Sequence, residues 1–131
     1  QIFAPGNLRA TSDNPRYKAL FDHWVTERYT LRYTGGMVPD VVHMFIKGKG
    51  IFSNVSSPTA KAKLRLLYEC APLALLVEAA GGASVVAPDV GGPAGEAPMS
   101  VLDLLIDNLD RRLGVCYGGT AEVDIFKRFM F

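Results

Sequence analysis

The sequence is poor in the residues that build disulfide frameworks, zinc sites and nucleic-acid surfaces. It holds two cysteines and two histidines among 131 residues, and Cys70 and Cys116 lie in no CxxC pair. The spacing of a zinc site is therefore absent. Two reduced, buried thiols are the expected state, although sequence alone leaves a disulfide open. The formal net charge is +1, so the basic excess of a nucleic-acid binder is missing.

No uninterrupted apolar run has the length of a membrane span. The first residues, Gln1 to Gly6, have the pattern of neither a signal peptide nor a transit peptide, and no initiator Met is present. We therefore expect the chain to be part of a longer protein. With 49% hydrophobic and 21% charged residues, residues 1–131 have the composition and length of one folded domain.

Hydrophobic spacing predicts alternating helices and strands. A cap and proline at Asn14-Pro15 mark one helix start, and further helices are expected near Pro39, from Pro72, and after a capping Thr120. Strands are expected at 2–4, 29–34, 51–55, 63–68, 83–87 and 114–118, an exposed loop at 88–98, and either a helix or irregular chain at 102–113. This order predicts an α/β fold of three-layer α/β/α type, with a mixed sheet flanked by helices.

The most informative segment is 63–69, which contains charged residues that could bind a ligand or a metal ion. If it is a strand, Lys63, Arg65, Leu67 and Glu69 share one face. Two cations suit a ligand with a phosphate at each end, and a carboxylate suits a divalent cation. A straight strand would place Lys63 and Glu69 ~20 Å apart. This overshoots a sugar bisphosphate, so side-chain reach or a bend must close the gap. On spacing alone, a solvated strand face or an Arg65–Glu69 pair is the more typical explanation.

Two loops could add polar contacts. Asn7, Arg9 and Thr11 follow the first strand and could meet a phosphate or hydroxyls, although a turn with a solvated arginine explains them as well. The run from Arg32 to Met37 contains two glycines, which allow close backbone approach before a helix. A simple strand-to-helix turn is the alternative there.

Taken together, these segments resemble the fructose-1,6-bisphosphatase superfamily, most closely its sedoheptulose-1,7-bisphosphatase branch. The resemblance is carried by GNLRAT at 6–11, YTLRYTGGMVPD at 29–40, SPTAKAKLRLLYE at 57–69 and PLALLVEAAGG at 72–82. It implies the C-terminal half of that fold and hydrolysis of the 1-phosphate of a ketose bisphosphate with Mg²⁺. It also implies a homodimer or homo-oligomer, a place in the Calvin cycle, and the chloroplast stroma as the location.

The resemblance also implies a role for individual residues at the distal end of the substrate. Lys63 resembles a residue that contacts the distal phosphate, and Tyr33 resembles one that lines the same site. Arg32 is similar to an arginine that reaches across a subunit interface to a neighbour's distal phosphate. Asn7 resembles an asparagine of the substrate loop, which also contains Arg9.

Toward the reacting end, Glu69 is similar to the one metal ligand that this half supplies. Arg65 resembles a basic residue near the metal, and Met37 a methionine whose backbone meets sugar hydroxyls. Asn54 stands where the fructose branch has a phosphate-binding tyrosine. The other metal ligands and the catalytic base are implied to lie in an N-terminal half, in a motif absent from these 131 residues.

Three functions therefore follow as expectations. The first is the substrate-binding half of a Mg²⁺-dependent sedoheptulose-1,7-bisphosphatase, inactive when isolated. The second is the same half of a fructose-1,6-bisphosphatase or a dual-specificity enzyme. The third, from a different class, is a stand-alone, non-catalytic binding or assembly subunit.

Overall fold

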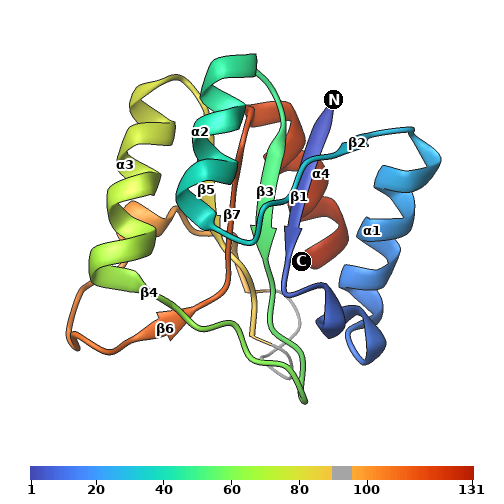
Figure 1. The fold of residues 1–131 in the computed structure, drawn as a ribbon. Helices are drawn as coiled ribbons and strands as arrows, with labels where there is room; N and C mark the ends of the chain where they lie inside the picture. Colours follow the sequence, from blue (N-terminus) through green and yellow to red (C-terminus); the bar gives the residue numbers. More distant parts are fainter. Residues whose placement is uncertain (90–95) are drawn as a thin grey trace.

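A mixed five-stranded sheet forms the middle of the molecule (Figure 1). The computed structural model describes residues 1–89 and 96–131, so part of the expected 88–98 loop lies outside the described residues. The strand order is β2-β1-β3-β7-β5. The strands are β1 (Ile2–Gly6), β2 (Thr30–Leu31), β3 (Ile51–Asn54), β5 (Ala83–Val86) and β7 (Val115–Gly118). β1 is parallel to β2 and β3, whereas β7 runs antiparallel to both β3 and β5.

Helices cover both faces of the sheet, as the three-layer prediction requires. α1 (Pro15–Thr26) and α4 (Thr120–Met130) pack on one face. α2 (Met37–Lys47) and α3 (Ala71–Ala79) pack on the other. Side chains alternate across each strand, so Phe3 joins the α1–α4 core while Ile2 and Ala4 join the α2–α3 core. The predicted α/β/α architecture is confirmed.

The predicted start of α1 is also confirmed. The Asn14 side chain accepts a hydrogen bond from the Tyr17 backbone N–H at 3.1 Å, and Pro15 is the first helical residue. This pair satisfies one free N–H and fixes the entry angle of the chain. The predicted cap of α4 is wrong, because Gly119 occupies the cap position and Thr120 is already helical.

The expected strand at 63–68 is wrong beyond its first residues. Only Leu64–Arg65 are extended, as β4, and they pair with β6 (Arg112–Leu113). Residues Leu66–Cys70 then form a π-helical turn that leads directly into α3. Leu66 and Cys70 are four residues apart and both fully buried, so helical spacing buries these two side chains in the core beneath α3.

Other boundaries differ less. The expected strand at 29–34 shrinks to β2, and the 102–113 stretch is irregular apart from the short turn Val101–Asp103 and β6. The described residues also contain two 3₁₀ turns, Leu8–Ser12 after β1 and Val101–Asp103 beneath α3. In the part of the chain that the structure describes, none of the helices is both long and apolar enough to cross a bilayer.

Both cysteines are buried free thiols, as expected. Cys70 belongs to the α2–α3 core and Cys116 to the α1–α4 core, so the sheet separates them. Burial raises the pKa of Cys70 to about 12 and raises that of Cys116 as well. Thiols in this state are weak nucleophiles and weak metal ligands.

Candidate phosphate-binding site

A positively charged hollow lies where β1 and β3 end. Because these strands are parallel, Gly6 and Asn54 close the same edge of the sheet and pair in register. The hollow has a volume of about 410 Å³ and is lined by Asn7, Leu8, Arg9, Tyr33, Asn54, Lys61 and Lys63. Within the described ranges no Asp or Glu lines it. Such a surface attracts anions.

After β1 the backbone turns sharply at Asn7, which lines the hollow. Asn7 is left-handed, with φ 51° and ψ 42°, a region that asparagine tolerates better than most residues. Gly6 lies against β3, where a Cβ would approach the Ser53 carbonyl oxygen to 2.8 Å. The buried Tyr17 hydroxyl donates to the Gly6 carbonyl at 2.8 Å and lies 3.0 Å from Ser53 Oγ.

The Asn7 side chain ties three parts of the site together. Its Nδ2 donates to the carbonyl oxygens of Val55 at 2.8 Å and Ala60 at 2.9 Å. Its Oδ1 accepts from Arg9 Nε at 3.1 Å. The amide nitrogen is therefore engaged within the chain, and Asn7 orients Arg9 toward the hollow that both residues line.

Four of the residues selected from sequence thus meet in one place: Asn7, Arg9, Tyr33 and Lys63. Lys61 lines the same hollow, and sequence reasoning missed it. The signal was present, because Lys61 and Lys63 are two apart in an extended segment and such residues share a face.

Arg65 and Glu69 form a separate pair on the turn before α3. The Arg65 backbone N–H donates to Glu69 Oε2 at 2.7 Å, and the Arg65 guanidinium lies 3.7 Å from the same oxygen. The guanidinium also lies 5.5 Å from the centre of the Tyr68 ring. Both charged side chains are about one-third exposed. The described residues contain no cluster of three or more His, Cys, Asp or Glu that could hold a metal ion.

The structure places the two remaining candidates outside the lining of the hollow. Arg32 is exposed, and its guanidinium donates to the carbonyl of Leu31. Met37 is the first residue of α2 and packs against the α2–α3 core.

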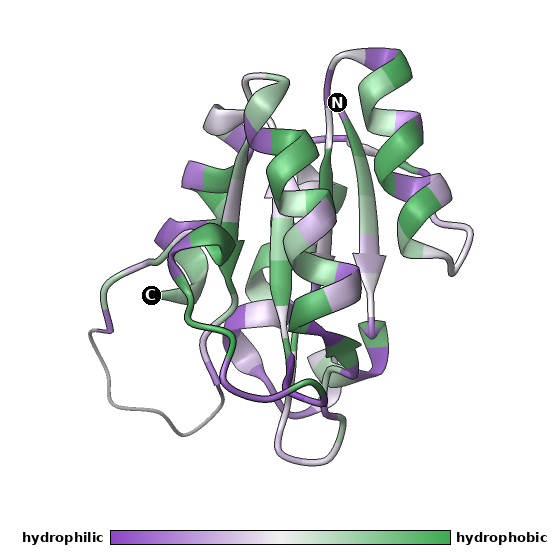
Figure 2. Cartoon of the chain, turned by 90° about the vertical axis from the view of Figure 1, so that its left-hand side faces the viewer, coloured by the Kyte–Doolittle hydropathy of each residue, from purple (hydrophilic) through white to green (hydrophobic). Residues whose placement is uncertain are grey.

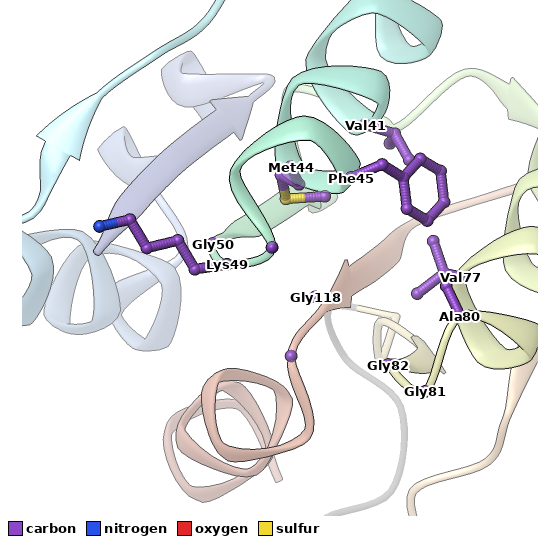
Figure 3. Close-up of a pocket in the computed structure, with 12 residues that line it drawn as sticks. Val41, Met44, Phe45, Lys49, Gly50, Val77, Ala80, Gly81, Gly82 and Gly118 are labelled. Atoms are coloured by element: carbon purple, nitrogen blue, oxygen red, sulfur yellow. The ribbon is translucent and has the colours of Figure 1, made fainter.

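A second hollow, of about 200 Å³, lies at the opposite end of the sheet between α2 and α3. Its walls are mostly glycine backbone and the apolar side chains of Val41, Phe45 and Val77. Figure 3 shows the one charged lining residue, Lys49, extending away from Phe45 and Val77. Among its described lining residues only Lys49 has a charged side chain, so this hollow suits a phosphate less well than the first one does.

Comparison with known proteins gives consistent relatives. The family model described as fructose-1-6-bisphosphatase, C-terminal domain, matches residues 1–131. The chloroplastic sedoheptulose-1,7-bisphosphatase of Chlamydomonas reinhardtii is 52% identical over 131 residues, which are 100% of this chain and 32% of that protein. A Toxoplasma gondii structure, provisionally named a sedoheptulose-1,7 bisphosphatase, has a TM-score of 0.87 at 43% identity, covering 98% of this chain and 38% of that one. For a Leishmania major fructose-1,6-bisphosphatase the TM-score is 0.80 at 31% identity, with coverage of 98% and 39%. The chain spans about a third of the length of these relatives.

Proposed function

Because the chain belongs to the fructose-1,6-bisphosphatase family, as its C-terminal domain, we propose that it is the substrate-binding part of a sedoheptulose-1,7-bisphosphatase. The observation that carries this proposal is the hollow with Arg9, Lys61 and Lys63 on its walls and no carboxylate among its described lining residues. It suits the distal phosphate of a ketose bisphosphate, since guanidinium and ammonium groups bind phosphate oxygens well.

The residues around the hollow would orient the sugar as well as hold the phosphate. Asn54 Oδ1 is buried and has no hydrogen-bond partner within the described residues. An unsatisfied buried acceptor is costly, and a rotation of the Asn54 side chain toward the hollow that it lines would let a sugar hydroxyl satisfy this oxygen. Tyr33 is 45% exposed and could stack against the sugar or donate to the phosphate. Binding energy from this end positions the reacting end of the substrate.

Glu69 is the residue of this chain that would hold Mg²⁺. A carboxylate is the ligand type that Mg²⁺ prefers, and Glu69 is partly exposed with Oε2 oriented by the Arg65 backbone. The bound ion would polarise the 1-phosphate and neutralise its charge. One carboxylate is a poor site by itself, so the remaining ligands and the catalytic base would come from an N-terminal part of the enzyme. The isolated chain would therefore not hydrolyse the substrate.

The surface of α2 and α3 supports an N-terminal part that covers it. Val42, Ile46, Leu75 and Leu76 are between 42% and 76% exposed on these helices. In Figure 2, where this side faces the viewer, the outward turns of α3 are predominantly green, the colour of hydrophobic residues. Exposed apolar surfaces of this kind mark interaction sites, and a further part of the same protein would cover this one.

The proposed substrate is sedoheptulose 1,7-bisphosphate, and the proposed setting is the Calvin cycle in the chloroplast stroma. Relatives named chloroplastic sedoheptulose-1,7-bisphosphatase are 52% and 53% identical to the chain, whereas bacterial class 1 fructose-1,6-bisphosphatases reach 36%. The exposed Arg32 outside the hollow agrees with a homodimer in which this residue reaches the neighbouring subunit. Fructose 1,6-bisphosphate remains the second candidate substrate.

A chimaera tests the proposal directly. The matching segment of the Chlamydomonas reinhardtii enzyme would be replaced by this 131-residue chain. We expect Mg²⁺-dependent phosphate release from sedoheptulose 1,7-bisphosphate by the chimaera and none by the chain alone. Fructose 1,6-bisphosphate measured in parallel distinguishes the substrates. A folded but inactive chimaera beside an active parent enzyme would instead support a non-catalytic subunit, and hydrolysis by the pure isolated chain would refute the division of the site.

A further inference from the structure

Lys61 and Lys63 project from one side of a short extended segment. The alanines between and beside them, Ala60 and Ala62, are 6% and 8% exposed, whereas both lysines are exposed and line the hollow. Alternation of buried and exposed residues is what an extended chain lying on a core produces. The segment therefore presents two ammonium groups to the same space.

Internal hydrogen bonds fix the backbone that carries Lys61. Ser57 Oγ accepts from the Ala60 N–H at 3.0 Å, and Ser56 Oγ accepts from the Ala62 N–H at 2.9 Å. The Ser57 N–H donates in turn to the Ala60 carbonyl at 2.9 Å. Lys61 is therefore flanked on both sides by backbone that is already ordered. Binding of a ligand to Lys61 then costs little further backbone entropy.

Two contacts from outside the segment hold it against the rest of the site. Asp13 Oδ2 accepts from the Thr59 N–H at 3.0 Å and from the Thr59 hydroxyl at 2.6 Å. Asn7 Nδ2 donates to the Ala60 carbonyl at 2.9 Å. The residue that orients Arg9 thus also holds the backbone next to Lys61, so these two cations share one support.

The three positive charges have no anionic partner among the described residues. None of the ion pairs of the described chain involves Arg9, Lys61 or Lys63. Like charges that face one space repel each other, and an anion that enters between them removes this repulsion. A doubly charged anion gains more from three cations than a singly charged one does.

We infer that Lys61 is a further specificity-determining residue of the distal subsite, which selects a phosphate monoester in its dianionic form. This inference rests on the proposed function, because it assumes that the hollow receives the distal phosphate. It adds a residue that the sequence did not single out, and it predicts a dependence on the charge state of the ligand.

The test is binding of sedoheptulose 7-phosphate, which carries only the distal phosphate, to the full chain by isothermal titration calorimetry. Lys61→Gln should weaken binding by at least about tenfold, because the change removes a charge-assisted hydrogen bond to the phosphate. Lys61→Arg should restore most of the affinity. Lys49→Gln, the same change at the opposite end of the sheet, is the matched control and should have no effect.

A pH series separates charge selection from a merely structural role. The second pKa of a phosphate monoester is about 6, so affinity for the unaltered chain should rise between pH 5 and pH 7.5. The rise should be smaller with Lys61→Gln. Sulfate, a dianion throughout this range, should bind without the rise. Circular dichroism would verify that each variant is folded.

The outcomes separate this inference from the proposed function. If Lys63→Gln weakens binding and Lys61→Gln leaves both the affinity and its pH dependence unchanged, the inference is overturned and the proposed site stands. If both variants bind as the unaltered chain does, or if the unaltered chain binds no sedoheptulose 7-phosphate, the site and the inference both fail.

Discussion

Replacing Asn7 with glycine and with alanine would separate two contributions of this residue to stability: its side-chain hydrogen bonds and its tolerance of a left-handed backbone. Asn7→Gly removes the amide, with its hydrogen bonds to Val55 at 2.8 Å and Ala60 at 2.9 Å, but keeps a residue suited to φ 51°. Each such bond contributes about 0.5–1.5 kcal/mol net, so the free energy of unfolding should fall by about 1–3 kcal/mol. Asn7→Ala removes the same bonds and adds the left-handed penalty of about 1–2 kcal/mol.

The penalty for alanine is partly offset, because the greater entropy of glycine in the unfolded chain favours unfolding of the glycine variant by about 0.4–1 kcal/mol. We therefore expect the alanine variant to be less stable than the glycine variant by roughly 1 kcal/mol. Urea unfolding followed by circular dichroism measures this. With a slope of about 2 kcal/mol per molar urea, the glycine variant should lose on the order of 1 M in its midpoint and the alanine variant somewhat more. An alanine variant as stable as the glycine variant would show that the backbone at residue 7 is not held in the left-handed region.

Three further outcomes are expected. Hydrogen bonding lowers the pKa of Asp13. The ionised Asp13 therefore stabilises the fold above its unfolded pKa of about 3.9, and this stabilisation is lost as the pH falls through the lower folded value. In Asp13→Asn the free energy of unfolding should lose this part of its dependence on acid pH, and an unchanged acid unfolding curve would contradict the prediction. Cys70 and Cys116 should resist iodoacetamide at pH 8 in the native chain and react fully in urea, as intact mass would record; rapid native labelling would contradict their burial. In the chimaera, Glu69→Gln should raise the Mg²⁺ concentration needed for half-maximal activity at least tenfold, whereas an unchanged Mg²⁺ dependence would remove Glu69 from the metal site.

Local chemistry was enough to predict the parts of the fold in which neighbouring residues decide the outcome. Asn14-Pro15 starts α1 because the cap and the proline act within one turn. The buried stripe of α4, Val123, Phe126 and Met130, follows from helical spacing and is 0–1% exposed. Where a segment fits both helical and strand spacing, the sequence alone did not predict which of the two forms. Leu66 and Cys70 fit helical spacing, while the alternating charges before them fit a strand, and the tertiary core decided for the helix.

The candidate site divides in the same way. Lys63 could be selected because its segment carries several charges and resembles a known family. The interaction of Asn7 with Arg9 depends on a left-handed residue, which no short sequence pattern signals clearly. Lys61 lies before the charged run 63–69, on the side toward which the extended chain continues, so alternation within that run alone does not include it.

The error at 63–69 strengthens the proposed function. A straight strand would separate Lys63 from Glu69 by ~20 Å, a gap that side-chain reach or a bend has to close if one substrate is to meet both residues. The extended chain ends at Arg65, and Leu66–Cys70 turn helically. Two extended steps and four helical ones, at ~3.3 Å and ~1.5 Å each, cover at most about 13 Å. The bend therefore brings Lys63, the candidate phosphate ligand, and Glu69, the candidate metal ligand, closer together. It also places Glu69 Oε2 against the Arg65 N–H. A lysine and a carboxylate at the two ends of a single bent segment can hold opposite ends of one bisphosphate, with less demand on side-chain reach than a straight segment would make.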